Sequence, residues 1–171
     1  MIRYCTRCVM PETKPDILFE GGVCSACRHF ADRSDLDWDA RRVELDQILD
    51  RYRSSDSSRY DCIIPVSGGK DSTYQTLRML ELGMNPLCVT ATTDKLTDIG
   101  RRNLDNVREL GVDHIEVSTN PLVRRRINHL ALSLVGDISW PEHVAIFTIP
   151  VRLAVQMRVP LIVWGENSQN E

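Results

Sequence analysis

The sequence lacks a surplus of positive charge and lacks any long apolar run. Its 171 residues carry a formal net charge of −3, so bulk charge creates no field that would attract nucleic acid nonspecifically, and we do not expect nucleic acid as a partner. No stretch of about 18 apolar residues occurs, and the polar N-terminus MIRYCTRCVM has no apolar signal-peptide core. We therefore expect no membrane span and no secretion, and we expect the protein to be cytoplasmic.

The first 30 residues have few periodic apolar positions, and so they lack the material for a core of their own. They contain two close cysteine pairs, Cys5-x2-Cys8 and Cys24-x2-Cys27, separated by fifteen residues. Two such pairs can form a tetrahedral thiolate cage, and cysteines in a reducing compartment more often bind metal than form disulfides. We predict a four-cysteine zinc-binding segment over residues 1–35. An iron–sulfur cluster on the same four thiolates stays open, because spacing alone does not exclude it.

Residues 36–58 are predicted to form a helix and a linker. Within 38–53 the apolar side chains recur at helical spacing, which indicates an amphipathic helix, and SSDSS at 54–58 indicates a break. The apolar positions of this helix are Trp38, Leu45, Ile48, Leu49 and Tyr52.

Residues 59–171 are predicted to form one α/β domain, with a parallel sheet flanked by helices. Short β-branched apolar runs alternate here with helical patterns of ten or more residues, which is typical of βαβ units. Pro150 interrupts the last helical pattern, so we expect a kink or two shorter helices there. Cys62 and Cys88 lie within expected strands and are interpreted as buried small hydrophobes. The expected strands are 62–66, 86–91, 114–117 and 161–164, and the expected helices are 71–82, 98–110, 121–135 and 141–157.

A glycine-rich loop directly follows the first strand of this domain and directly precedes a helix. Two glycines allow a close approach of the backbone to an anion, and the helix N-terminus adds partial positive charge. The serine hydroxyls can donate to phosphate, Lys70 can offset charge, and Asp71 can cap the helix or hold Mg²⁺. The pattern is neither GxxxxGK[ST] nor GxGxxG. The sequence therefore predicts a phosphate-binding loop, with a simple connecting turn as the alternative; its residues are Ser67, Gly68, Gly69, Lys70, Asp71 and Ser72.

In this setting the hexapeptide SGGKDS resembles the PP-loop of the ATP pyrophosphatase superfamily, which includes GMP synthetase, NAD synthetase and tRNA-thiolating enzymes. The resemblance implies binding of the ATP pyrophosphate and cleavage between the α and β phosphates. It also implies that the strand end at Ala91 passes the adenine, and that Gly165 and Glu166 face the same crevice. Lys70, Asp71 and Glu166 are then the candidate catalytic residues. Asp94 and Glu166 are candidates for contact with Mg²⁺ or substrate, or else solvated loop carboxylates.

The segments CTRCVMPETKP, GGVCSAC, IPVSGGKDS and WGEN together resemble the N-acetyl sugar amidotransferases of surface-polysaccharide (lipopolysaccharide, O-antigen) biosynthesis. That resemblance implies an enzyme using ATP, Mg²⁺ and Zn²⁺ that converts the acetamido group of a nucleotide sugar into an acetamidino group. Adenylation of the amide oxygen would precede attack by ammonia. The resemblance implies that partner subunits similar to a glutaminase and a cyclase supply the ammonia.

Members of that family continue beyond a WGEN-type strand end, so we expect this chain to be truncated at its C-terminus and its ATP-binding domain to be incomplete. Two other functions stay open. A tRNA-thiolating PP-loop enzyme would share the first chemical step, and a nonenzymatic, zinc-stabilised nucleotide-binding fragment would bind without reacting. Arg124, Arg125 and Arg126 either steer a nucleotide, a nucleotide sugar or RNA, or form a solvated helix face.

Overall fold

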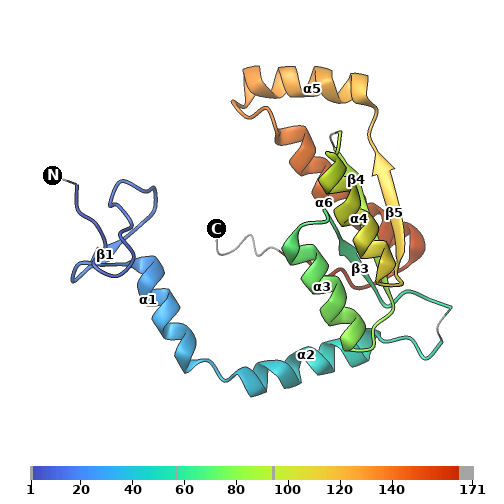
Figure 1. Cartoon of the computed structure of the whole chain (residues 1–171), viewed down its shortest axis with the longest axis horizontal. Helices are drawn as coiled ribbons and strands as arrows, with labels where there is room; N and C mark the ends of the chain where they lie inside the picture. The colour runs from blue at the N-terminus through green and yellow to red at the C-terminus, as the bar shows by residue number, and fades with distance from the viewer. Residues whose placement is uncertain (1, 57, 94, 166–171) are drawn as a thin grey trace. The chain divides into compact units, whose positions relative to one another are not determined.

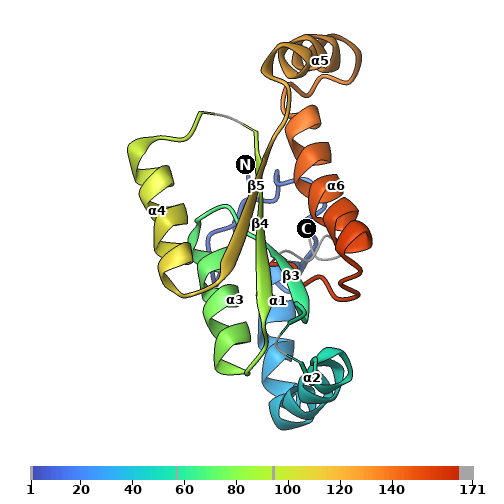
Figure 2. The same cartoon turned by 90° about the vertical axis from the view of Figure 1, so that its right-hand side faces the viewer.

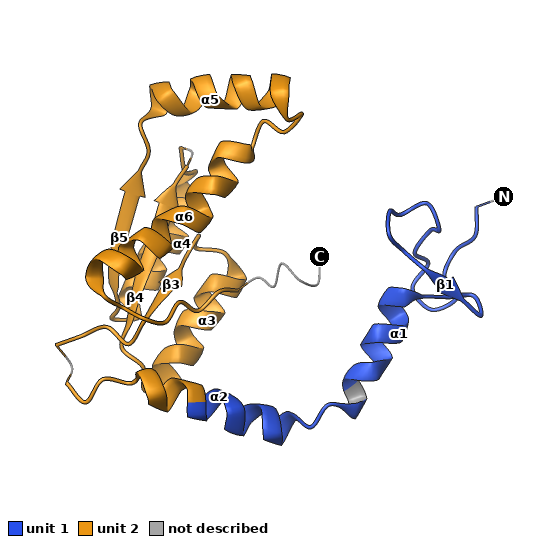
Figure 3. Ribbon diagram, turned by 180° about the vertical axis from the view of Figure 1, so that it is seen from behind, with its two compact units in different colours: residues 1–47 blue, residues 48–171 orange. Residues whose placement is uncertain are grey.

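The computed structural model describes residues 2–56, 58–93 and 95–165. The chain divides into two compact units, Met1–Gln47 and Ile48–Glu171, and the boundary falls inside helix α2 (Trp38–Tyr52) (Figure 3).

The first unit is a small cysteine-containing module. A two-stranded antiparallel ribbon, β1 (Phe19–Glu20) and β2 (Val23–Cys24), turns at Gly21 and Gly22, both at positive φ. Helix α1 (Ser25–Asp32) and the 3₁₀ turn η1 (Arg33–Asp35) follow. Among the described residues of this unit only Cys5 and Cys24 are buried. The unit therefore has no apolar core beyond its own cysteines, as its composition predicts.

The second unit is built on a parallel sheet in the order β3-β4-β5, which confirms the predicted α/β fold class (Figure 1). Its strands are β3 (Cys62–Pro65), β4 (Pro86–Thr92) and β5 (Asp113–Ser118). The expected strand at 161–164 is reduced to one parallel bridge between Ile63 and Ile162. Ile63 N–H donates to the Leu161 carbonyl and Val163 N–H to the Ile63 carbonyl, both at 2.9 Å. That expectation is therefore corrected from a strand to a single rung against β3.

Helices cover both faces of this sheet (Figure 2). Helices α3 (Lys70–Glu81) and α4 (Asp98–Glu109) lie on one face, where Ile64 and Cys88 meet Met79, Leu104 and Val107. Helix α6 (Trp140–Met157) lies on the other face, where Ala154 and Val159 meet Ile63, Leu87 and Val89. Successive strand residues point to opposite faces, so continuous apolar runs are what a sheet buried on both sides requires.

Helices α2 and α6 test two of the sequence-based expectations. Helix α2 buries only Leu49 (2% exposed), whereas Trp38 is 56% exposed and Leu45 and Ile48 are also exposed. The predicted helix is present, and within the second unit its end at Leu49 packs into the core. Helix α6 continues through Pro150 as one helix, so a division into two helices is wrong. Pro150 is buried, and packing of α6 on the sheet offsets the missing hydrogen bond.

Helix α5 (Pro121–Leu134) lies against α6 through a polar seam. Asn128 Nδ2 donates to the Glu142 carboxylate at 2.7 and 2.8 Å and to the Ile138 carbonyl at 2.6 Å, and Arg124 Nε lies 3.7 Å from Glu142. Arg124 therefore pairs inside the unit, while Arg125 and Arg126 are exposed. The large apolar side chains that the same helix exposes are Leu122, Val123, Ile127, Leu130, Leu132 and Leu134. No helix within the described ranges is both long and apolar enough to cross a membrane.

Asp61, just before β3, ties two neighbouring segments together and is only 3% exposed. Its carboxylate accepts from Ser54 N–H at 2.6 Å and from Asn85 N–H at 2.7 Å.

We expect Asp61→Ala to lower the free energy of unfolding by about 3 kcal/mol, because two backbone donors lose their acceptor. Asp61→Asn should lower the free energy of unfolding by about half as much. Urea denaturation followed by tryptophan fluorescence measures both. Glu109→Ala, on the exposed end of α4, is the control, and equal midpoints for Asp61→Ala and wild type would contradict the role.

Candidate functional site

The predicted phosphate loop connects the buried strand β3 to the first turn of α3. Gly69 is the N-cap of that helix, with φ −75° and ψ 168°, and it offers no side chain to cap the helix. An N-cap with a side-chain oxygen would satisfy one of the first-turn N–H groups. A glycine at this position leaves those groups to the solvent or to a ligand, which is the arrangement used for anions.

The loop is shaped by its own serine hydroxyls. Ser67 Oγ accepts from Gly69 N–H at 3.3 Å, and Ser72 Oγ accepts from Ser67 N–H at 3.4 Å. Ser72 Oγ also donates to the Gly69 carbonyl at 3.1 Å, and Thr73 Oγ1 donates to the same carbonyl at 3.0 Å. The hydroxyl proton of Ser72 is therefore directed inward, whereas the hydroxyl proton of Ser67 is available to a ligand.

The two glycines of the loop are constrained differently. Gly68 has φ +77°, and a Cβ added there would lie 3.1 Å from both Asn103 Cβ and Leu104 N of α4. Gly69 has negative φ, and an added Cβ would meet only Ser67 Oγ at 3.3 Å. Gly68 is thus required by the backbone and by the packing of α4, while a small residue at Gly69 would leave the fold intact.

Lys70 and Asp71 form an exposed ion pair at the start of α3. Lys70 Nζ lies 2.7 and 2.8 Å from the two Asp71 carboxylate oxygens, with side chains 88% and 73% exposed. Exposed pairs of this kind contribute at most about 1 kcal/mol. An incoming phosphate can therefore displace Asp71 from Lys70 at little cost, leaving the carboxylate free to contact Mg²⁺.

Other polar groups gather where the strands end. Ala91 and Thr92 close β4, and Thr119 follows β5; the side-chain oxygens of Thr92 and Thr119 are buried without a hydrogen-bond partner in the described part of the chain. Gln75 Oε1 of α3 is likewise buried and unpartnered, and a Cβ on Gly165 would lie 3.0 Å from it. The structure thus brings Gly165 to the helix that follows the phosphate loop. Asp94 and Glu166 lie outside the described residues.

The sequence-based prediction did not include Gln75, although its spacing from Asp71 indicates that the two residues share a helix face. It stands four residues after Asp71, so both belong to the same face of α3. Only the approach of Gly165, ninety residues later in the chain, singles it out as part of the site.

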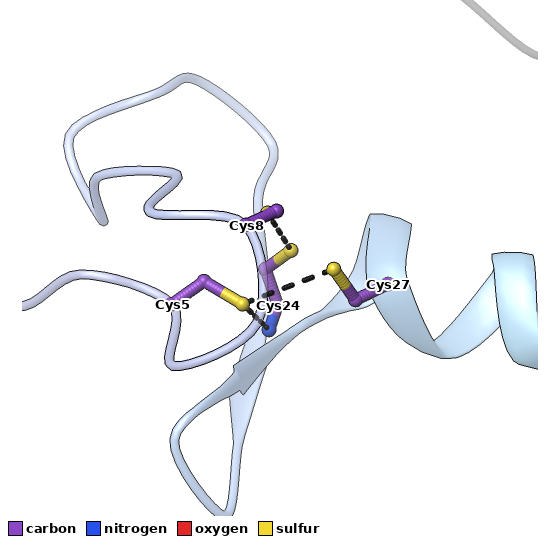
Figure 4. A group of neighbouring side chains, drawn as sticks. All are labelled: Cys5, Cys8, Cys24 and Cys27. Atoms are coloured by element: carbon purple, nitrogen blue, oxygen red, sulfur yellow. Dashed lines mark hydrogen bonds between the residues drawn. The ribbon is translucent and has the colours of Figure 1, made fainter.

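The four N-terminal cysteines converge on one point (Figure 4). Their sulfur atoms all lie within 4.8 Å of one another, with Cys5–Cys27 at 3.9 Å and Cys8–Cys24 at 3.6 Å. A tetrahedron of thiolates around Zn²⁺, with Zn–S bonds of about 2.3 Å, has an edge of about 3.8 Å. Backbone N–H groups of Arg7 and Cys24 donate to Cys5 Sγ at 3.4 and 3.3 Å. The cluster can therefore hold a metal ion such as zinc.

The pKa values of two of these thiols, Cys5 and Cys27, differ widely. The backbone N–H of Cys24 lowers the pKa of Cys5 to about 6, while the hydrogen bond with Cys8 raises the pKa of Cys27 to about 12. Four thiolates this close repel one another, and a bound cation removes that penalty. The spacing favours one ion over an iron–sulfur cluster, because a cluster places several iron and sulfide atoms between its cysteines.

The remaining two cysteines have no such arrangement. Cys62 and Cys88 are fully buried in β3 and β4. Burial raises the pKa of Cys62 to about 12 and that of Cys88 to about 11. Both are therefore protonated thiols that behave as small hydrophobes, as predicted.

Comparisons with known proteins add little. No protein-family model matches the chain, and no curated protein matches it. A solved structure similar to it is that of NMN synthetase from Francisella tularensis, at 18% identity and a TM-score of 0.46. The likeness covers 56% of this chain and 41% of the other, so the chain spans well under half of that protein. A likeness this weak decides nothing about ligand or reaction.

Metal content can be predicted from the cysteine geometry. We expect one zinc ion per chain by elemental analysis, lost when Cys24 and Cys27 are both replaced by serine, because two remaining thiolates bind zinc far more weakly. Cys88→Ala, which removes a thiol buried in β4, is the matched control and should keep the metal. Iron in place of zinc, or zinc retained by the double variant, would contradict the assignment.

Proposed function

We propose that this chain is the ATP-binding part of a PP-loop ATP pyrophosphatase that adenylates a substrate oxygen. The observation that carries the proposal is the loop Ser67–Ser72, which follows a buried parallel strand and opens a helix capped by glycine. Phosphate sites on α/β folds are found at this position, beyond the carboxyl ends of the strands.

In this proposal the loop holds the β and γ phosphates of ATP. First-turn N–H groups of α3 and the Ser67 hydroxyl donate to phosphate oxygens, and Lys70 turns from Asp71 to the phosphate chain. Magnesium bound near Asp71 would neutralise charge on the departing pyrophosphate. The residues thus stabilise the leaving group, while the acceptor oxygen must be held in line with the α-phosphate.

For the acceptor we propose the amide oxygen of an acetamido nucleotide sugar, as in the N-acetyl sugar amidotransferases of lipopolysaccharide and O-antigen biosynthesis. The amide oxygen attacks the α-phosphorus and pyrophosphate leaves. Ammonia then adds to the imidate carbon, AMP departs with the oxygen, and loss of a proton leaves the acetamidino group. The support is the cysteine segment joined to an SGGKDS loop in one chain. Ammonia-supplying glutaminase-like and cyclase-like subunits belong to the same proposal.

Thiolation of tRNA is the second candidate, and it has less support. Persulfide chemistry needs an accessible, ionisable cysteine in the nucleotide-binding domain. Cys62 and Cys88, the two cysteines of the second unit, are fully buried and carry raised pKa values. Neither can exchange sulfur with a donor without opening the core.

Binding of ATP tests the loop itself. We expect Gly69→Val to weaken ATP binding at least tenfold by calorimetry, because its side chain would occupy the space a phosphate needs beside Ser67 Oγ. Gly100→Ala, an unstrained position in α4, is the control and should bind as wild type does. Equal affinity of Gly69→Val and wild type would mean that the loop is only a connection.

Product formation tests the reaction. With radiolabelled ATP, Mg²⁺, an acetamido nucleotide sugar and ammonia, we expect release of AMP that requires the sugar. Lys70→Met should reduce that release about 100-fold, since the variant loses the ammonium that compensates negative charge on the leaving pyrophosphate. Its melting temperature should stay unchanged because the Lys70 side chain is exposed. Release that depends on tRNA and a sulfur donor would establish thiolation instead. ATP binding without AMP from either acceptor would identify a nucleotide-binding fragment.

A further inference from the structure

A chain of hydrogen bonds runs from α4 through the sheet to the start of the phosphate loop. Arg108 Nε donates to His114 Nδ1 at 3.2 Å, and His114 Nε2 lies 2.7 Å from Thr90 Oγ1. Thr90 Oγ1 donates to the Val66 carbonyl at 2.6 Å. Val66 is the residue directly before Ser67, so the chain of bonds ends where the loop begins.

The donors in this series of hydrogen bonds determine which nitrogen of His114 carries the proton. The single hydroxyl proton of Thr90 is given to Val66, so Thr90 must accept from His114, and Nε2 carries a proton. Nδ1 accepts from the Arg108 guanidinium and is therefore unprotonated. His114 is thus a neutral imidazole with both nitrogens hydrogen-bonded.

The surroundings maintain that neutral form. Burial lowers the pKa of His114, and Arg108 and Arg101 on α4 lower it further, against the opposing charges of Glu116 on β5 and Asp105 on α4. Glu116 is itself engaged by Arg101 at 2.7 and 3.1 Å and by Arg108, so much of its charge is already compensated.

The Val66 carbonyl controls the loop because a peptide unit is planar. Val66 C=O and Ser67 N–H belong to the same unit, so fixing one direction fixes the other. Thr90 holds the carbonyl, and Ser72 Oγ of α3 accepts from the Ser67 N–H at 3.4 Å. The position of His114 is therefore transmitted to the first peptide of the loop.

We propose that His114 is a positioning residue for phosphate binding: in its neutral form it holds the Thr90 hydroxyl on the Val66 carbonyl and so fixes the entry of the loop. The proposal rests on the proposed function, in which the loop binds the ATP phosphates. If His114 gained a proton at Nδ1, two N–H donors, those of Nδ1 and of Arg108, would face each other and repel. The ring would then turn away from Arg108 and draw Nε2 off Thr90.

The first test is ATP affinity by calorimetry at pH 8. His114→Leu should weaken binding about fivefold and Thr90→Val about tenfold, the range that loss of one hydrogen bond produces. His114→Leu combined with Thr90→Val should be no weaker than Thr90→Val alone, because His114 acts through Thr90. His114→Gln can donate to Thr90 and accept from Arg108, so it should bind within about twofold of wild type.

The pH profile separates positioning from simple stability. Because the pKa of His114 is lowered by burial, wild type should keep its affinity through about pH 6.5, the ordinary pKa of histidine, and lose it progressively at lower pH as His114 gains its proton. His114→Gln, compared at the same pH values, reports the titration of ATP itself and should not show the extra loss. Melting temperatures of all variants are measured alongside.

A second readout needs neither ATP nor a variant that folds poorly. In NMR spectra of the free wild-type protein, the amide resonances of Ser67 and Gly68 should shift together with the His114 ring as pH is lowered. Amide resonances that stay fixed while the ring titrates, or wild-type affinity in His114→Leu, would overturn the positioning role. Coupled resonances in a protein that binds no ATP at any pH would instead overturn phosphate binding and leave the link between His114 and the loop standing.

Discussion

The close contact between Gly68 and α4 is the constraint on which the phosphate loop depends. A Cβ at Gly68 would be crowded by Asn103 and Leu104 at 3.1 Å, and the positive φ of Gly68 turns the chain from β3 into α3. Leu104 is at the same time part of the core beneath α3 and α4. The loop is therefore placed by the same packing that holds the sheet and its helices together, and its shape is set before any ligand arrives.

A different constraint governs the first unit, which has almost no apolar interior. Where the structure describes this unit, its two buried side chains are both cysteines, and the four sulfur atoms occupy the place that a hydrophobic cluster would have in a larger module. Where burial of apolar surface is small, coordination of a metal supplies the folding free energy. The second unit is thus held together by apolar packing, whereas the first unit brings together four thiols that could hold a metal ion such as zinc.

Much of this arrangement could be predicted from the sequence, because it is local. Apolar runs between helical patterns predict β3, β4 and β5, and SGGKDS predicts the loop at its strand-to-helix junction. The errors come from interactions that depend on tertiary context. Of the apolar stripe on α2, only Leu49 is buried among the described residues, and the expected strand at 161–164 forms a single rung. The sequence assigns no role to His114 or Gln75, because their neighbours Thr90 and Gly165 are brought close only by the tertiary fold.

The contact between α5 and α6 contains a polar seam, so its strength depends on temperature and salt differently from the apolar packing of α6 on the sheet. Apolar contacts such as those of α6 on β3 and β4 weaken on cooling, whereas the bonds from Asn128 and Arg124 to Glu142 do not depend on that effect. Dissolved ions, on the other hand, screen a charge pair and leave apolar packing largely untouched. Because the Arg124 and Glu142 side chains are only 22% and 14% exposed, salt screens their pair less than an exposed one, and the attachment of α5 is consequently less sensitive to cooling than the packing of α6 on the sheet.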